Sequence, residues 1–480
     1  MQLFSKNFRK LQNNLPILMI LLFVVDFWGC EHSLEPLRNQ QKPKPPSEAT
    51  LVFSKHVLPI FQKNCAFNGC HGEQNAQVGL QLLSWESIVQ GSDAGEVIIP
   101  FAPQQSLLIE MVSGIGQPRM PFNSPPLDST TIDTLRQWIS EGAPKDDGTI
   151  PYSHPGPRLF VPNRGDGWIS IIDPAFQTVG RIVSLNNGGI KNPRPTAIAA
   201  NAEHWFVAVR GASEIWQYDR ERNEMLAKAE LDGQPSHLIL VGGKLYVAVD
   251  STNGKVSNQV AIIDAETMQT LKTITVQREP VALAAAADGS LVFVANRGAD
   301  WISVIDPRSD TVVRGFPLVE SGEPDGPAMY EPISLALSSD AATLWVGCKR
   351  ISQVRAYDAS DGRLLAEISV RPFPGQIALS ADGSKLYVPN QDSDRLTIID
   401  TAAMQIKKVA TFFGLAAPIG CAVSADGKRI YVSNSNANGK YFPRRVAGRR
   451  GNVAILDAET DQLLKVLEVE EMPGWLTVSQ

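Results

Sequence analysis

The chain has 480 residues, of which 43% are hydrophobic and 20% are charged, and its formal net charge is −6. This balance is typical of folded globular domains and excludes a disordered or fibrous protein, and a net acidic chain argues against a nucleic-acid-binding function. The number and clustering of the five cysteines do not fit a disulfide framework. They lie at Cys30, Cys65, Cys70, Cys348 and Cys421.

Residues 1–29 have the pattern of an export signal: a basic start followed by an apolar segment over residues 15–25. At about 1.5 Å per residue, this segment is too short to cross a hydrocarbon core about 30 Å thick. It ends at Gly29-Cys30, which resembles a bacterial lipoprotein signal. The resemblance implies a lipidated Cys30, a periplasmic or cell-surface location and membrane contact through the lipid anchor only. An ordinary secretory signal is the alternative. Residues 30–50 are polar and proline-rich, as expected of a tether.

Residues 51–145 are predicted to form a small helical domain that contains an unusual cysteine motif. Cys65 and Cys70 are separated by four residues, and His71 directly follows the second cysteine. Two thiols can form thioethers with the vinyl groups of a porphyrin, and an adjacent histidine can bind its iron. A disulfide between the two cysteines is the alternative, but it leaves the adjacent histidine unexplained.

Further segments around this motif occur in a recognisable order. They are Pro59-Ile60-Phe61, Gly79-Leu80-Gln81-Leu82, Met120-Pro121 and a closing helix that contains Trp138-Ile139. We expect Ser129 or Thr130 to cap that helix, whose apolar side chains recur at helical spacing. Together these segments resemble a cytochrome c subgroup of exported bacterial proteins.

The resemblance implies one covalent haem c, attached at Cys65 and Cys70, with His71 and Met120 as the axial ligands of the iron. Met111 is the competing sixth ligand. It is less favoured because it lies within a predicted helix, whereas prolines on either side stiffen the loop around Met120. With both axial positions filled by the protein, no substrate can reach the iron, which favours one-electron transfer over catalysis.

After a linker over residues 146–157, residues 158–480 repeat at about 45 residues, the spacing of propeller blades. An aromatic residue followed by valine recurs at Phe160, Phe206, Tyr246, Phe293, Trp345, Tyr387 and Tyr431. An aspartate ending an apolar strand recurs at Asp173, Asp219, Asp264, Asp306, Asp358, Asp400 and Asp457. A proline opening another strand recurs at Pro195, Pro235, Pro280, Pro332, Pro374, Pro418 and Pro473. The pattern resembles the YVTN-type propellers of exported proteins. The predicted fold is therefore multidomain: a small all-α cytochrome c-like domain followed by an all-β seven-bladed β-propeller.

The ends of the repeat region predict how the ring closes. The region begins in the second strand of a blade, and the segment from Pro473 has the pattern of a first strand. We therefore expect that segment to complete the first blade and to remove the open edge. Insertions follow Val249 and Asn434 and also separate Phe316 from Glu331, all on the same face of the ring. We expect this loop-rich face to dock a redox partner protein or a small-molecule ligand.

Charged side chains are expected at the channel mouth on this face, four residues after each repeated aromatic. These positions hold Arg164, Arg210, Asp250, Arg297, Lys349, Gln391 and Ser435. The insertion in the seventh blade adds Lys440, Arg444, Arg445, Arg449 and Arg450. An anion site and simple solvation of loop charge are both open here, with solvation the simpler explanation. Cys348 and Cys421 lie in predicted strands and are expected to pack as small buried side chains.

Three functional hypotheses follow from these patterns. The first is a lipid-anchored c-type cytochrome that carries electrons and is not itself an enzyme. The second is a dehydrogenase whose propeller binds a small substrate and whose haem accepts the electrons. The third is a surface-binding propeller with an accessory haem domain. Covalent haem would separate the first two hypotheses from a purely structural role for the helical domain.

Overall fold

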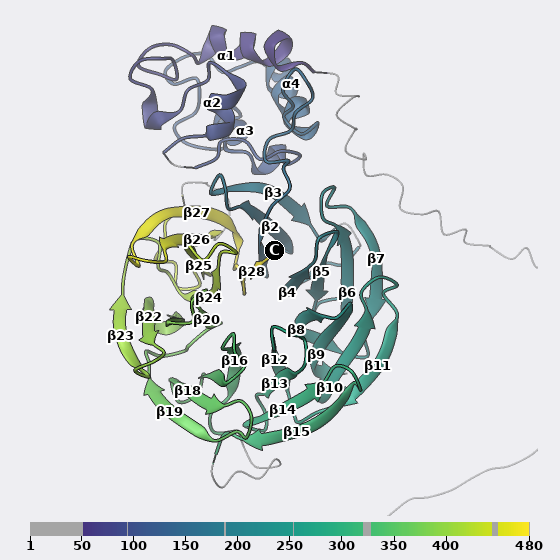
Figure 1. Cartoon of the computed structure of the whole chain (residues 1–480). Helices are drawn as coiled ribbons and strands as arrows, with labels where there is room; N and C mark the ends of the chain where they lie inside the picture. Colours follow the sequence, from purple (N-terminus) through teal and green to yellow (C-terminus); the bar gives the residue numbers. More distant parts are fainter. Residues whose placement is uncertain are drawn as a thin grey trace, which may run out of the picture. The chain divides into compact units, whose positions relative to one another are not determined.

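The computed structural model describes residues 51–93, 95–186, 189–252, 254–319, 328–443 and 450–479. A small helical domain is followed by seven four-stranded sheets arranged as a ring (Figure 1), which confirms the predicted fold class. The predicted export signal, the tether and Cys30 lie outside the described residues. Within those ranges, no helix combines the length and the apolar character that a membrane span requires.

The helical domain consists of short helices joined by turns. They are η2 (Phe53–Val57), α1 (Leu58–Asn64), η3 (Gln77–Gly79), α2 (Trp85–Gln90), η4 (Pro103–Gln105), α3 (Leu107–Val112) and α4 (Ser129–Ser140). The prediction that Ser129 or Thr130 caps α4 was wrong. Asp128 is the cap, since its Oδ1 accepts a hydrogen bond of 2.8 Å from the backbone N–H of Thr131. A carboxylate satisfies the free N–H groups of a helix start as well as a hydroxyl does.

The core of the helical domain forms where α4 packs against η2 and α3. Leu135, Trp138 and Ile139 are fully buried on one side of α4. The indole of Trp138 lies 5.7 Å from the ring of Phe53, and its N–H donates a 3.0 Å hydrogen bond to the carbonyl of Pro144. Trp138 is thus a core residue with a satisfied polar atom.

The propeller blades share one order, in which the innermost strand is followed outward by three antiparallel neighbours. From inside to outside, the first four blades are β28 (Thr477–Val478), β1 (Leu159–Asn163), β2 (Trp168–Asp173), β3 (Thr178–Ser184); β4 (Pro195–Ala200), β5 (His204–Val209), β6 (Glu214–Asp219), β7 (Met225–Glu230); β8 (Gln234–Val241), β9 (Lys244–Thr252), β10 (Lys255–Asp264), β11 (Thr270–Thr275); and β12 (Pro280–Ala285), β13 (Val292–Asn296), β14 (Trp301–Asp306), β15 (Thr311–Pro317). The last three are β16 (Pro332–Leu337), β17 (Thr343–Cys348), β18 (Gln353–Asp358), β19 (Leu364–Ser369); β20 (Ala378–Leu379), β21 (Lys385–Asn390), β22 (Arg395–Asp400), β23 (Gln405–Ala410); and β24 (Pro418–Val423), β25 (Arg429–Asn434), β26 (Arg450–Asp457), β27 (Leu463–Glu471).

The ring closes as the sequence predicts. Strand β28 pairs with β1 in antiparallel register, Thr477 opposite Phe160 and Val478 opposite Leu159. The preceding residues reach other blades: Ser433 Oγ donates to the carbonyl of Gly474 at 2.6 Å, and Gln376 exchanges two hydrogen bonds with Leu476. The segment 473–476 therefore ties blades six and seven to blade one in addition to completing its sheet.

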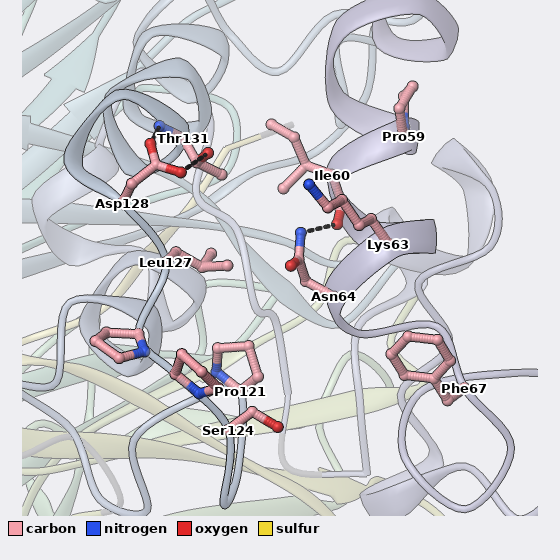
Figure 2. Close-up of a pocket in the computed structure, with 12 residues that line it drawn as sticks. Pro59, Ile60, Lys63, Asn64, Phe67, Pro121, Ser124, Leu127, Asp128 and Thr131 are labelled. Atoms are coloured by element: carbon pink, nitrogen blue, oxygen red, sulfur yellow. Dashed lines mark hydrogen bonds between the residues drawn. The ribbon is translucent and has the colours of Figure 1, made fainter.

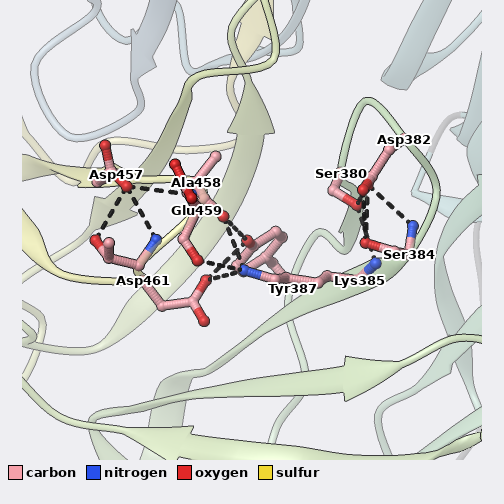
Figure 3. Close-up of polar contacts among 10 residues, drawn as sticks. Ser380, Asp382, Ser384, Lys385, Tyr387, Asp457, Ala458, Glu459 and Asp461 are labelled. Atoms are coloured by element: carbon pink, nitrogen blue, oxygen red, sulfur yellow. Dashed lines mark hydrogen bonds and ion pairs between the residues drawn. The ribbon is translucent and has the colours of Figure 1, made fainter.

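Polar contacts between neighbouring blades occupy the ring face that carries the short hairpins (Figure 3). Lys385 Nζ lies 2.9 Å from Asp461 Oδ1, and the hydroxyl of Tyr387 donates to the same carboxylate at 3.0 Å. Blades three and four repeat this arrangement, with Lys244 and Tyr246 both bound to Asp310 at 2.6 Å. Side chains on this face thus hold neighbouring blades together.

Candidate functional site

The cysteine motif folds into a tight loop at the end of α1. Cys65 caps the helix through a 2.8 Å hydrogen bond from its N–H to the carbonyl of Phe61. The chain then turns back, so that the N–H of His71 donates to the carbonyl of Cys65 at 3.2 Å. Gly72 is required here, because a Cβ would lie 2.7 Å from the backbone of Phe67. The C-x4-C spacing therefore still brings both cysteines and the histidine into one loop.

The two thiols of the motif are free and differ in exposure. Cys65 is buried, whereas Cys70 is exposed. Burial, and then the neighbouring Cys70, raise the pKa of Cys65 to about 11. Cys65 is therefore a protonated thiol at neutral pH, protected inside the domain, and the two sulfur atoms are close enough to influence each other.

His71 is held in the orientation that a metal-binding histidine needs. Its Nδ1 lies 3.2 Å from the carbonyl of Leu80, which can only accept a hydrogen bond, so Nδ1 carries the proton. Nε2 is then left with its lone pair, as in histidines that bind metals through one nitrogen and are oriented through the other. Burial lowers the pKa of His71 and so favours the neutral form.

The two candidate methionines lie near each other. The N–H of Met120 donates a 3.0 Å hydrogen bond to the carbonyl of Met111, and Met120 packs against the core of the helical domain. The sulfur of Met111 lies against Gly116, where a Cβ would approach it to 2.7 Å. Met111 is thus covered by the loop that leads to Met120, while Met120 is carried on that loop.

Large apolar side chains are exposed around these residues. Phe67 is 50% exposed, Val78 58%, Ile115 60% and Phe122 61%. Phe67 follows Cys65 and Phe122 follows Met120 by two residues, so exposed apolar rings accompany the predicted ligands, as at surfaces that bind a partner or ligand. In the described part of the chain, Nη1 of Arg119 is buried without a hydrogen-bond partner, although Nη2 donates to Ser124. A haem is an apolar ring system that carries carboxylates. The ring could cover the exposed apolar side chains, and a carboxylate could pair with the free N–H of Arg119, so these residues fit a haem.

A cavity of about 490 Å³ lies beside the motif (Figure 2). Its walls come from α1, the first turn of α4 and two loops, and they include Phe67 of the cysteine loop and Pro121, which follows Met120. The lining residues are Pro59, Ile60, Lys63, Asn64, Phe67, Pro121, Ser124, Pro125, Pro126, Leu127, Asp128 and Thr131. The predicted thiols, imidazole and thioether do not line this cavity, so it adjoins the predicted ligand loops and is not enclosed by them.

Sequence reasoning singled out the cysteines, the histidine and both methionines but missed three contributors. The carbonyl of Leu80 orients His71, Arg119 offers an unpaired N–H, and Phe122 presents an exposed ring. The position of Arg119 directly before Met120 was the one available signal for it. The roles of Leu80 and Phe122 depend on how the loops fold, which no local pattern reveals.

On the loop-rich face of the propeller, most of the predicted charges are paired. Arg210 Nη1 lies 2.7 Å from Asp250 Oδ1, and Arg297 Nε lies 3.2 Å from Glu279 Oε2. In the seventh-blade insertion, Arg450 is buried and pairs with Glu470, and Lys440 binds Asp394. Both acids come from outside the insertion, which explains why its sequence showed only basic residues. Arg444, Arg445 and Arg449 lie outside the described residues.

Two family models match parts of this chain. The model of the YNCE-like beta-propeller matches residues 245–441, and the model of the Planctomycete cytochrome C matches residues 68–122. The second range contains Cys70, His71 and Met120 and begins after Cys65. The chain thus combines a cytochrome c-like domain, which suggests haem c binding, with a YNCE-like propeller. This combination fits a haem-containing electron-transfer protein.

Solved structures resemble the chain in fold. Hydrazine synthase of Kuenenia stuttgartiensis is 19% identical, with a TM-score of 0.49 over 59% of this chain and 89% of that chain. A functionally unknown protein from Desulfotomaculum acetoxidans DSM 771 is 12% identical, with a TM-score of 0.54 over 67% of this chain and 99% of that chain. At this identity, the second likeness concerns the fold alone. No curated protein sequence matches the chain.

Proposed function

We propose that this protein is an exported, lipid-anchored c-type cytochrome that transfers single electrons through one covalently bound haem, with the propeller docking a redox partner or ligand. The observation that carries the proposal is the contact between His71 Nδ1 and the carbonyl of Leu80, next to two free cysteines. This contact leaves Nε2 available for iron in the loop that would hold the porphyrin.

Each residue of the site has a distinct role in this proposal. Cys65 and Cys70 would attach the porphyrin, and His71 and Met120 would bind its iron. When bound, the haem supplies reversible one-electron chemistry, at a potential that a His/Met ligand pair raises. Phe67 and Phe122 would shield the bound group from water, and Arg119 would pair with one of its carboxylates. With His71 and Met120 both holding the iron, the protein would leave no position on it for a substrate, which favours electron transfer over catalysis at the iron.

The test is expression of the full chain together with a haem-maturation system, followed by a pyridine haemochrome spectrum of the denatured protein. We expect one covalent haem per chain. Cys348→Ala is the matched control, because it removes a cysteine outside the motif and should leave the spectrum unchanged. A parent protein that is folded but carries no covalent haem would overturn the proposal.

The sixth ligand is tested with two matched variants, Met120→Ala and Met111→Ala. Loss of Met120 should convert a low-spin, methionine-ligated spectrum to a high-spin one and lower the reduction potential, whereas Met111→Ala should keep the low-spin spectrum. If only Met111→Ala changes the spin state, Met111 is the ligand. The anchor is tested by mass spectrometry of the mature protein, where a diacyl or triacyl Cys30 is expected and an unmodified N-terminus further along contradicts it.

A further inference from the structure

The charges at the channel mouth of the loop-rich face are balanced on one side of the ring and unbalanced on the other. In blades two to five, Arg210 and Arg297 flank Asp250, and Lys349 lies 4.0 Å from Glu331. At the junction of blades one and two, Arg164 and Arg194 form no ion pair or side-chain hydrogen bond with any residue that the structure describes. We call these two residues the arginine pair.

Arg164 is held at the mouth by backbone contacts and by a glycine. It follows β1, and its N–H donates a 3.0 Å hydrogen bond to the carbonyl of Met472. Its side chain lies over Gly474, where a Cβ would stand 3.6 Å from both Cδ and Nε of the arginine. Nε is buried and has no partner among the described residues. The guanidinium is therefore partly removed from water without a compensating acid, which is a costly arrangement for a charge.

Arg194 brings a second positive charge to the same place. It directly precedes β4, the innermost strand of blade two, and its carbonyl accepts a hydrogen bond from the N–H of Arg210. The turn that follows Arg164 reaches this segment, since a Cβ on Gly167 would lie 2.9 Å from Pro193. Burial and the charge of Arg194 lower the pKa of Arg164, in agreement with this proximity. Arg194 itself is exposed and can approach a ligand from solvent.

The acidic residues nearest in the fold are already engaged. Asp166 Oδ2 accepts the N–H of Glu471 at 2.8 Å, and burial raises the pKa of Asp166 to about 7, which weakens it as a counter-charge. Glu470 pairs with Arg450 at 2.5 Å. Glu471 is not free either. Among the residues that the structure describes, the charge of the arginine pair is therefore unmatched.

We propose that the arginine pair binds a small divalent oxyanion, a phosphate or a dicarboxylate, at the channel mouth between blades one and two. Guanidinium groups present planar forks of N–H donors that match the oxygen atoms of both anions. This inference rests on the part of the proposed function that assigns ligand binding to the loop-rich face, and it is independent of the haem.

The experiment uses the full chain in low-salt buffer, titrated calorimetrically with inorganic phosphate and separately with succinate. Arg164→Gln and Arg194→Gln should each weaken binding of the preferred anion about tenfold, the effect of losing one charge-assisted contact. Arg222→Gln is the matched control. It removes one exposed arginine from the turn after β6, on the hairpin face, and should leave binding unchanged. Arg164→Lys keeps the charge without the fork and should give an intermediate affinity.

Binding of either anion that depends on the arginine pair supports the proposal, and the anion that binds more tightly identifies the ligand chemistry. Absence of binding of both anions to the parent protein, or an equal loss in Arg222→Gln, overturns it. If Arg164→Gln does not fold, the Arg194→Gln variant is sufficient for the test, because Arg194 is exposed. Binding should persist in Cys65→Ala/Cys70→Ala protein, so a failure here is distinguishable from a failure of the haem assignment.

Discussion

The two folded regions of this chain differ in where their unpaired and exposed side chains lie. In the helical domain, Phe67 and Phe122 are exposed, Cys70 is exposed, and one N–H of Arg119 has no partner among the described residues. On the hairpin face of the propeller, lysines, tyrosines and aspartates of adjacent blades satisfy each other. In the helical domain the exposed and unpaired groups thus lie in the loops that carry the predicted haem ligands. In the ring the hairpin face links neighbouring blades, while buried atoms without a described partner, such as Arg164 Nε and Asn296 Oδ1, lie elsewhere.

The largest effect should separate the two kinds of cysteine. Replacing both motif cysteines, in Cys65→Ala/Cys70→Ala, removes the two thiols that can form thioethers, so covalent haem should fall to zero in the haemochrome assay. The propeller should keep its melting transition, because these residues lie outside it. Full haem content in the double variant would show that these two cysteines do not attach the haem.

The next effect concerns closure of the ring. Deleting residues 473–480 removes the pairing of β28 with β1 and the contact between Trp475 and His237, whose rings lie 5.2 Å apart. Trp475→Ala alone should cost about 3 kcal/mol of unfolding free energy, and the deletion should cost more, since it also exposes an edge strand. Chemical denaturation measures both. A truncated ring as stable as the parent would show that closure by β28 adds nothing.

A pH effect of intermediate size should come from His237, which is partly buried. Burial lowers the pKa of His237 to about 4, and its Nδ1 accepts a hydrogen bond from the N–H of Leu283. The unfolded chain binds a proton near pH 6.5, whereas the folded chain stays neutral down to about pH 4. The stability from neutral His237 is therefore complete above pH 6.5 and lost as the pH falls to 4, by about 3 kcal/mol.

The matched variant for this prediction is His237→Gln, which keeps an acceptor for Leu283 but does not titrate. The difference in unfolding free energy between parent and variant should change between pH 7 and pH 4, while the haem spectrum of each protein stays the same. A constant difference over that range would mean that His237 is not buried as described.

The smallest effect should come from the propeller cysteines. Cys348 and Cys421 are almost completely buried in β17 and β24, and burial raises the pKa of Cys348 to about 12. Cys421→Ala should cost about 1 kcal/mol through the lost sulfur contacts, and Cys421→Ser should cost more because it buries a hydroxyl. Thermal melting measures both, and haem content should not change. A loss of haem in either variant would contradict the prediction that the propeller cysteines only pack in the core.

Much of the propeller was predictable because each blade repeats the same landmarks. Seven prolines and seven aromatics gave seven independent observations of one unit, so the blade number and the closure by the segment after Pro473 followed. The cap of α4 was predicted wrongly, because Asp128, Ser129 and Thr130 can all serve and only the backbone geometry selects one.

Only the residues of the site that belong to one local sequence motif could be predicted. Cys65, Cys70 and His71 belong to one local motif, but the carbonyl that orients His71 belongs to Leu80, across a loop. At the propeller mouth, the repeat predicted where Arg164 and Arg210 lie but not which of them is paired. The partner of Arg210 is Asp250 of the next blade, and that contact depends on how the blades are placed in the ring.

The pairing of β28 with β1 also makes the propeller a closed circle in which the position of the chain break is arbitrary. Arg158 and Ser479 bind each other through two hydrogen bonds, each 2.9 Å long, so the two ends of the propeller are already adjacent. A circularly permuted ring, joined there and opened at the exposed Gly242-Gly243 turn, should retain every blade. Such a permutant would allow the helical domain to be attached to a different blade without altering the ring.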